Sequence, residues 1–466
     1  MNKKLSRRDV LKLSGPLVAG ALLAACTTPE ATEAPVTLPT APPTEAPVTP
    51  PTEAPVAKPI EGTVVFMHRR KEFSEEEQAA FEAKYPGVKV ELVEDDPTRL
   101  FAMLAAGAAP DLYRCQAPSI PQFLARRMIK DLTPYFEASS IVKLDDLNSF
   151  NDYYKANSPL EIGSGKIYGM CKDASPDNTL FINTALYEAA GLPIPDDTKA
   201  LTYAEVAQNA LATKALDGDR VVNFGYSGNA EFWSDRQWMV MLAETGGKLY
   251  TDQFDQITFG DDAKAIVQWF ADLAKENASI SPRNPSPNYW GGGDFGAGIL
   301  SQLQHGYWMM QSAETDATRG KVKMLPAPTW AGTRMDPTIT ATGMVMLDKG
   351  ANPDAAWLLF EFYNGDEPAV ARAKGGWGVP ALKSLVPLLP QETDYNKQCF
   401  NVLEGELALG TPPVQFNPFI GESTVLNSYL KFLDQVLKDQ ISFDDMIKNV
   451  TDEVNLAILE GIDRLG

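Results

Sequence analysis

Histidine and cysteine are scarce in this chain, and their scarcity excludes the common zinc and iron–sulfur sites. The 466 residues contain two histidines, His68 and His305, and four cysteines with no C-x-x-C pair among them. Zinc fingers, H-E-x-x-H proteases and iron–sulfur proteins need a different set or spacing of these ligands. We therefore expect no metal and no cofactor. The cysteines are Cys26, Cys115, Cys171 and Cys399.

Positive charge is also in short supply. Lysine and arginine number 41 against 61 aspartates and glutamates, which gives a formal net charge of −20. Such a surface repels a phosphate backbone, so the sequence predicts no nucleic-acid partner. Cys115 and Cys171 could form a disulfide in an oxidising compartment, but the sequence does not show whether they, or Cys399, meet a partner.

Familiar catalytic and nucleotide-binding motifs are missing. Residues 163–166 read G-S-G-K but lack the spacing of a phosphate-binding loop, and no G-x-S-x-G nucleophile elbow is present. The glycine-rich residues 291–298 do not close a strand in a G-x-G-x-x-G pattern, and we interpret them as a flexible loop beside Trp290. The sequence thus predicts a protein that is not an enzyme. A lipid-anchored glycoside hydrolase stays open as an alternative, because it needs only two carboxylates.

Residues 1–26 have the features of an export signal. A basic head with five lysines and arginines precedes the short apolar run at residues 13–25, which is shorter than the roughly 20 residues of a membrane span. Within the head, S-R-R-D-V-L-K at residues 6–12 resembles the twin-arginine motif. The run ends in L-A-A-C, which resembles a bacterial lipobox and implies that Cys26 becomes the lipidated first residue.

Residues 27–60 form a low-complexity segment. The pattern T-E-A-P-V starts at residues 32, 44 and 52, and the segment has ten prolines and no aromatic residue. Such a composition cannot build a core, so we expect a disordered, extended spacer between the membrane and a globular body.

The body alternates strand and helix patterns, which predicts an α/β fold with a parallel sheet. Residues 63–67 form a short apolar run, Ser74 and Glu77 form a capping box, and residues 88–93 alternate as a second strand. A helix at 100–106 and a short strand at 111–113 follow. The last third, residues 426–465, is predicted to be helical without strands. The length of the body favours two lobes over a single α/β domain.

Six short segments of the body share their order and pattern with one protein family. They are F-E-A-K-Y-P-G-V-K-V at 81–90, L-A-A-G-A-A-P-D-L at 104–112, G-K-I-Y-G-M at 165–170, L-F-I-N-T at 180–184 followed by A-A-G-L at 189–192, G-Y-W at 306–308 and G-G-W-G-V-P at 375–380. Together they resemble the extracellular solute-binding proteins of ABC importers, the maltose-binding-like (family 1) class, over most of residues 61–466. Met170 and Cys171 depart from the family pattern, which commonly has a proline at this place.

The resemblance implies a two-lobe periplasmic-binding-protein-like fold whose ligand lies in a cleft between the lobes. The first lobe would comprise residues 61–170 and 325–370, and the second 171–324 and 371–466, with a helical C-terminal part. It further implies a monomer that captures a small solute, most often a carbohydrate, and delivers it to an ABC permease. The protein would act outside the cytoplasm, anchored by lipid at the cell surface or in the periplasm. A surface receptor with the same fold is a second alternative.

Polar residues at strand ends are the first candidates for ligand contacts, because ligands of open α/β sheets bind beyond the carboxyl ends of the strands. The candidates are His68, Arg69 and Arg70 after the first strand, Gln116 after the third, and Asp177 and Asn178 before the strand that enters the second lobe. Arg69 and Arg70 could bind an acidic or phosphorylated sugar in a bidentate way, or could be solvated surface charges.

Aromatic residues in loop-like segments are the second group, because sugars present flat apolar faces that stack on rings. Trp269 and Trp357 lie in amphipathic patterns and are expected in the core. The family resemblance assigns Trp308 and Trp377 to positions of cleft aromatics. The remaining candidates are Trp233, Trp290 and Phe419, with Trp330 also in a loop-like stretch.

Overall fold

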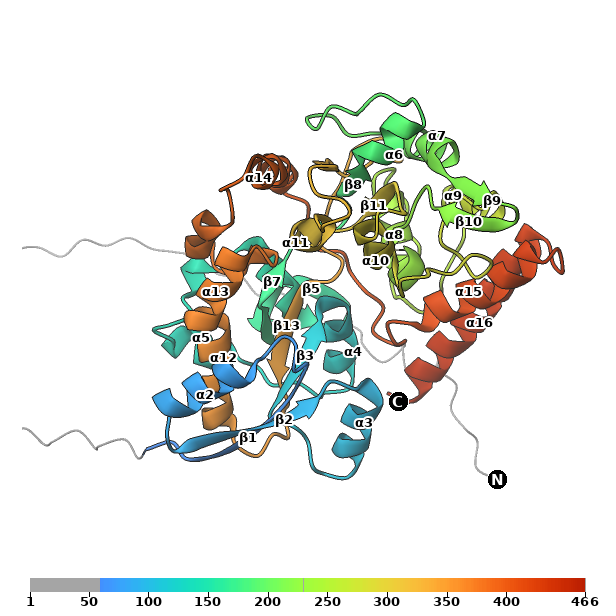
Figure 1. The fold of residues 1–466 in the computed structure, drawn as a ribbon. Helices are drawn as coiled ribbons and strands as arrows, with labels where there is room; N and C mark the ends of the chain where they lie inside the picture. Colours follow the sequence, from blue (N-terminus) through green and yellow to red (C-terminus); the bar gives the residue numbers. More distant parts are fainter. Residues whose placement is uncertain (1–58, 229, 466) are drawn as a thin grey trace, which may run out of the picture. The chain divides into compact units, whose positions relative to one another are not determined.

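The computed structural model describes residues 59–228 and 230–465 (Figure 1). The side chains of residues 230–233, with Trp233 among them, are not described. The predicted signal peptide, the lipidation residue Cys26 and all but the last two residues of the predicted spacer lie outside the described range. The described residues belong to one compact unit.

A five-stranded sheet forms around the N-terminal part of the body. Its strand order is β2-β1-β3-β13-β6. The first three strands in sequence pair in parallel, as their alternation with helices predicts, whereas β13 runs antiparallel to both of its neighbours. The strands span Gly62–His68 (β1), Val88–Glu94 (β2), Leu112–Gln116 (β3), Gly169–Cys171 (β6) and Thr342–Met346 (β13). Strand β13 thus returns to this sheet from late in the sequence.

Helices from distant parts of the chain cover this first sheet. Helix α2 starts at the predicted capping box of Ser74 and Glu77, and its Phe81 contacts Phe362 of α12 with ring centroids 5.4 Å apart. Asp96 caps α3. The helices of this region are α2 (Glu75–Lys84), α3 (Pro97–Ala105), α4 (Ile120–Ala125), α5 (Thr133–Ala138), α12 (Pro353–Gly365) and α13 (Glu367–Gly375).

A second, antiparallel sheet has the order β11-β8-β12. Helices α15 and α16 lie side by side (Figure 1). Their apolar residues share a core with α7, α8 and α9. The bounds are Leu180–Asn183 (β8), Gln302–Gln304 (β11), Val322–Leu325 (β12), Tyr203–Thr213 (α7), Ala230–Ala243 (α8), Asp261–Lys275 (α9), Asp394–Leu407 (α14), Thr424–Leu437 (α15) and Phe443–Asp463 (α16). The predicted helical C-terminal part is confirmed.

Asp177 ties together two chain segments that cross between the sheets. Residues 172–179 lead from β6 to β8, and residues 326–341 lead from β12 back to β13. The fully buried Oδ2 of Asp177 accepts hydrogen bonds from the amides of Ile339 (2.8 Å) and Thr340 (3.0 Å) and from the hydroxyls of Thr338 and Thr340. The amide of Asn178 donates to Asp336 at 2.8 Å. These bonds fix the two crossings to each other.

The glycine-rich residues 291–298 are not the flexible loop that we expected. Residues Gly291–Gly296 form a short helix, α10, which is buried at Gly291 and Gly292. A Cβ atom on Gly291 would lie 1.9 Å from Oγ of Ser227, and one on Gly292 would lie 2.3 Å from the ring of Trp290. The glycines therefore serve close packing, which a sequence pattern does not separate from flexibility.

Cys115 and Cys171 lie on opposite sides of Gly343 in the first sheet. Gly343 of β13 is the register partner of Cys115 on one side and of Cys171 on the other. Two strand spacings, roughly 10 Å, separate the two cysteines, and this is beyond the roughly 7 Å that a disulfide can span. Cys115, Cys171 and Cys399 are all buried free thiols.

Gly343 is a point where the sheet has no room for a side chain. A Cβ atom there would lie 2.1 Å from the carbonyl oxygen of Met170 and 2.6 Å from Cα of Cys171. We expect Gly343→Ala to lower the free energy of unfolding by about 1–3 kcal/mol through overpacking. Denaturant melts of this variant should be compared with those of Gly405→Ala, an exposed site in α14 with no atom within 4 Å. Equal midpoints for the two variants would contradict the packing argument.

Candidate ligand-binding site

A cavity of about 580 Å³ opens beyond the carboxyl ends of β1, β2 and β3. Arg69 and Glu72 follow β1, Asp95 follows β2, and Gln116 ends β3. The other walls come from the crossing at residues 172–175, from Trp308, from Trp377 after α13, and from the connector at residues 421–423. This volume is within the usual range of small-molecule sites.

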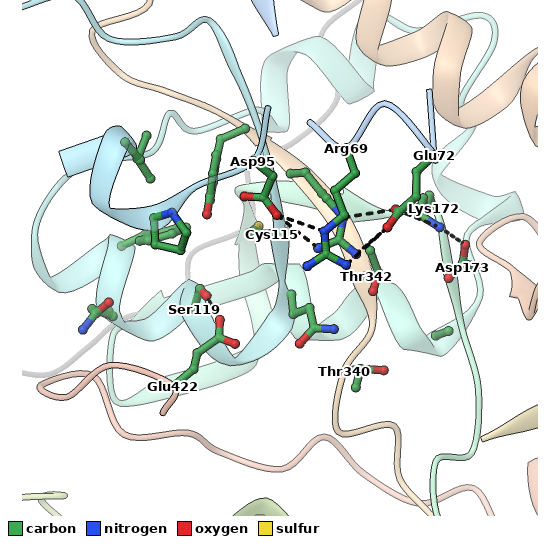
Figure 2. Close-up of a pocket in the computed structure, with 18 of the residues that line it drawn as sticks. Arg69, Glu72, Asp95, Cys115, Ser119, Lys172, Asp173, Thr340, Thr342 and Glu422 are labelled. Carbon is green, nitrogen blue, oxygen red and sulfur yellow. Dashed lines mark hydrogen bonds and ion pairs between the residues drawn. The ribbon is translucent and has the colours of Figure 1, made fainter. Parts of the chain in front are cut away.

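Six charged side chains in the cavity form one connected network (Figure 2). Arg114 donates two hydrogen bonds to Glu72, from Nε at 3.0 Å and from Nη2 at 2.9 Å. Lys172 lies 3.5 Å from Glu72 and also contacts Asp173. Arg69 pairs with Asp95 at 3.3 Å and lies 3.6 Å from Glu72. Three cations and three anions therefore offset one another inside the cavity.

The charges of this network act on its buried members. Burial by itself would raise the pKa of Glu72, but Lys172 and Arg114 outweigh burial and hold this pKa well below its ordinary value. Burial raises the pKa of Asp173 even though Lys172 contacts it. The side chains of Arg114 and Lys172 are 7% and 2% exposed. Their charges are therefore met by protein carboxylates and hardly by water.

Aromatic rings form another wall of the cavity. Trp308 lines the cavity, and Trp290 stacks on it with planes 9° apart and centroids 6.0 Å apart. His305 packs edge-on against both rings. Trp377 is 43% exposed and lies 5.9 Å from Nζ of Lys172. The cavity therefore offers exposed ring surface beside a polar network.

Glu422 joins elements around the far end of the cavity. It contacts the hydroxyl of Ser119 and accepts a hydrogen bond at 2.8 Å from Arg236 of α8. Arg236 also donates to the carbonyl of Ile339 at 3.0 Å and to Gln116 at 3.3 Å. Figure 2 shows Ser119 and Glu422 apart from the main charge network.

Four of the residues predicted from the sequence line the cavity. They are Arg69, Gln116, Trp308 and Trp377. Trp290 stands behind Trp308 and does not line it. The side chain of Trp233 is not described, although its backbone belongs to α8. Contact with a ligand remains a prediction for each of them.

The other predicted residues lie elsewhere. His68 is buried between the rings of Phe66 and Tyr363, and burial lowers its pKa to about 3. Arg70 is largely exposed and pairs with Glu75 at 3.7 Å. Asp177 and Asn178 serve the crossings, and Phe419 packs against the core of the C-terminal helices. Of the two arginines, therefore, only Arg69 lines the cavity.

Several cavity residues were missed by the sequence analysis. Asp95 directly follows β2, so the strand-end rule that selected residues 68–70 could have found it. Glu72 lies four residues past its strand, and only the turn at residues 69–73 returns it to Arg114. Lys172 and Asp173 sit in a crossing whose path the sequence does not show. Glu422 lies in a connector without a recognisable pattern.

Two further properties concern the described residues only. Within residues 59–228 and 230–465, no group of three or more His, Cys, Asp or Glu side chains is placed to hold a metal ion. Among the helices of the same residues, none combines the length and the hydrophobicity that a membrane crossing needs.

A family comparison covers most of the body. Residues 78–398 match the family described as bacterial extracellular solute-binding protein. The chain belongs to this family. Solute-binding proteins of this kind act outside the cytoplasm, in agreement with the sequence prediction. No curated protein matches this solute-binding protein.

Solved structures show the same fold. An ABC substrate-binding protein of Listeria monocytogenes in complex with cycloalternan has a TM-score of 0.68 at 18% identity, covering 85% of this chain and 98% of its own. A solute-binding protein of Thermotoga lettingae bound to α-D-tagatose gives 0.66 at 18% identity, with 86% and 100% covered. The maltose-bound MalE3 of T. maritima gives 0.65 at 17%, with 84% and 99% covered. The two-lobe α/β fold of this solute-binding protein is confirmed, while the exact lobe boundaries stay a prediction.

His305, behind the tryptophan wall, should make stability depend on pH. Burial lowers its pKa to about 3, so the unfolded chain, where histidine titrates near 6.5, takes up the proton first as the pH falls. Below pH 6.5 we expect His305→Phe to gain stability relative to the wild type by up to about 1.4 kcal/mol per pH unit. Melting temperatures of both proteins between pH 7 and pH 5 test this, because other titrating groups are common to both. If the difference in melting temperature between the two proteins does not change with pH, His305 takes up a proton as readily in the folded protein as in the unfolded chain.

Proposed function

We propose that this solute-binding protein captures an uncharged carbohydrate outside the cytoplasm and delivers it, as a monomer, to the permease of an ABC importer. The observation that carries the proposal is the combination, in one cavity, of two tryptophan rings with a network of three cations and three carboxylates. Rings stack on the apolar faces of sugars, and planar charged groups that hold one another in place can bind hydroxyls.

The ligands bound in known structures of the same fold support the proposal that the ligand is a carbohydrate. Their bound molecules include cycloalternan, α-D-tagatose, maltose and D-mannitol, all of them uncharged and rich in hydroxyl groups. The sequence left an acidic sugar open because of Arg69 and Arg70. Arg69 is engaged by Asp95 and Glu72, and Arg70 pairs with Glu75 outside the cavity. This arrangement favours a neutral ligand.

The closing of the two lobes on the ligand would follow from contacts on both sides of the cavity. Asp95 and Gln116 come from the first sheet, and Trp308 comes from the segment after β11 of the second sheet. A ligand that touches both sets of residues stabilises the closed form, because it binds that form better than the open one.

The first experiment is a ligand screen on residues 59–466. We expect the melting temperature to rise with neutral mono- or oligosaccharides or polyols, because a ligand of the native state alone raises it. The ligand should be recovered unchanged; its conversion to products would favour a glycoside hydrolase. If no sugar or polyol shifts the melting temperature, the proposal that the ligand is a carbohydrate is overturned.

Trp308→Ala tests the site within the same assay. We expect its affinity for the identified sugar to fall at least about tenfold, the factor that 1.4 kcal/mol represents. The free variant should remain folded, with a lower melting temperature because Trp290 and His305 lose their ring contacts. Tyr289→Ala is the matched control, since Tyr289 is an aromatic residue that is 95% exposed and outside the cavity. Equal affinities of the two variants would remove Trp308 from the site.

We also propose that lipid on Cys26 holds the protein at the membrane after export by a twin-arginine signal. The support is the L-A-A-C sequence after a short apolar run, together with the extracellular family of the body. In a bacterial host fed labelled palmitate, the full-length chain should carry label and sediment with membranes. Cys26→Ser should lose both properties, and label that persists in this variant would contradict the assignment.

A further inference from the structure

The carboxylate of Glu72 occupies the position in the cavity that suits an anionic ligand best. Arg114 presents two nitrogen atoms to it at 2.9 and 3.0 Å, and Lys172 and Arg69 lie within 3.6 Å. Two parallel N–H···O bonds from one guanidinium group are the usual way in which proteins bind the carboxylate of a ligand. The protein's own side chain therefore fills an arginine fork that could otherwise bind an acidic solute.

Removing this carboxylate would leave the cations of the cavity without a full set of partners. Arg114 and Lys172 are almost fully buried, and a buried charge without a partner is strongly unfavourable. An anion that entered from solution would relieve this imbalance. With Glu72 and Asp95 in place, the three cations are matched by three carboxylates, and an added anion would meet carboxylates that repel it.

Asp95 carries a second sign of the ligand that the cavity suits. One of its oxygens, Oδ2, pairs with Arg69 at 3.3 Å and lies 3.8 Å from Arg114, and its carboxylate also hydrogen-bonds the hydroxyl of Tyr113. The Asp95 side chain is 9% exposed and lines the cavity. A carboxylate oxygen accepts hydrogen bonds only. A solute hydroxyl has a hydrogen to donate to it, and an ionised carboxylate or phosphate has none.

We propose that Glu72 and Asp95 determine specificity by neutralising the cations of the cavity, so that the protein selects hydroxyl-rich uncharged solutes and rejects their acidic counterparts. This inference rests on the proposed function and adds to it the residues that set the charge of the ligand.

Sugar pairs that differ in one carboxylate give the sharpest test. Wild type, Glu72→Gln and Asp95→Asn are titrated calorimetrically with D-glucose and D-glucuronate, with D-galactose and D-galacturonate, and with inorganic phosphate. The wild type should bind no acidic member as well as its neutral partner. In Glu72→Gln, the ratio of acid to neutral affinity should rise at least about tenfold, since one buried negative charge is removed. This gain should shrink with added salt.

Glu75→Gln is the matched control. Glu75 is an exposed carboxylate three residues from Glu72, it pairs with Arg70, and it does not line the cavity. Its loss changes the net charge of the protein by the same amount, so its affinities should remain those of the wild type. Melts of each free variant establish that it is folded. Asp95→Asn provides the same test should Glu72→Gln fail to fold.

The outcomes separate the inference from the function on which it rests. Equal binding of acidic and neutral partners by the wild type would overturn the inference, as would folded Glu72→Gln and Asp95→Asn variants that gain nothing for acids or phosphate. A different outcome is that no sugar binds the wild type, while Glu72→Gln acquires glucuronate or phosphate binding that Glu75→Gln lacks. The proposal of a carbohydrate ligand would then be wrong, and the role of Glu72 in excluding anions would stand.

Discussion

The ion pairs around Glu72 join parts of the chain that are far apart in sequence. Glu72 lies in the turn after β1, Arg114 on β3, and Lys172 in the crossing to the second sheet. Opposite charges at these distances in a poorly hydrated site attract one another strongly. The network is stabilising only while every charge keeps its partner, because an unpaired buried charge is unfavourable. The same contacts thus position the strand ends, fix the start of one crossing, and set the electrostatic character of the cavity.

The fold was largely accessible from the sequence because local rules agree with the tertiary structure there. The capping box at Ser74, the parallel pairing of β1 to β3 and the helical C-terminal part follow from residue patterns that tertiary contacts do not override. The helical state of residues 291–296 did not follow. There, glycine permits close contact with Ser227 and Trp290, and neither neighbour is visible from the local sequence.

The candidate site was accessible only in part. The strand-end rule selected the right edge of the sheet, yet it does not tell which side chains point into the cavity. His68 turns into the core, Arg70 turns to solvent, and Arg69 between them lines the cavity. Lys172 and Glu422 could not be found, because their positions depend on how the crossing and the connector pack. Asp177 was selected because it precedes the strand that enters the second lobe, and its carboxylate accepts hydrogen bonds from the backbone of the facing crossing.

The buried thiols of the first sheet affect how the protein can reach its final form. Cys115 and Cys171 are held apart by strand β13, and burial raises the pKa of both, so that neither is a reactive thiolate. No covalent cross-link between them is needed to complete the sheet. Cys399 is a buried free thiol as well, so the described body of the protein needs no oxidant in order to fold.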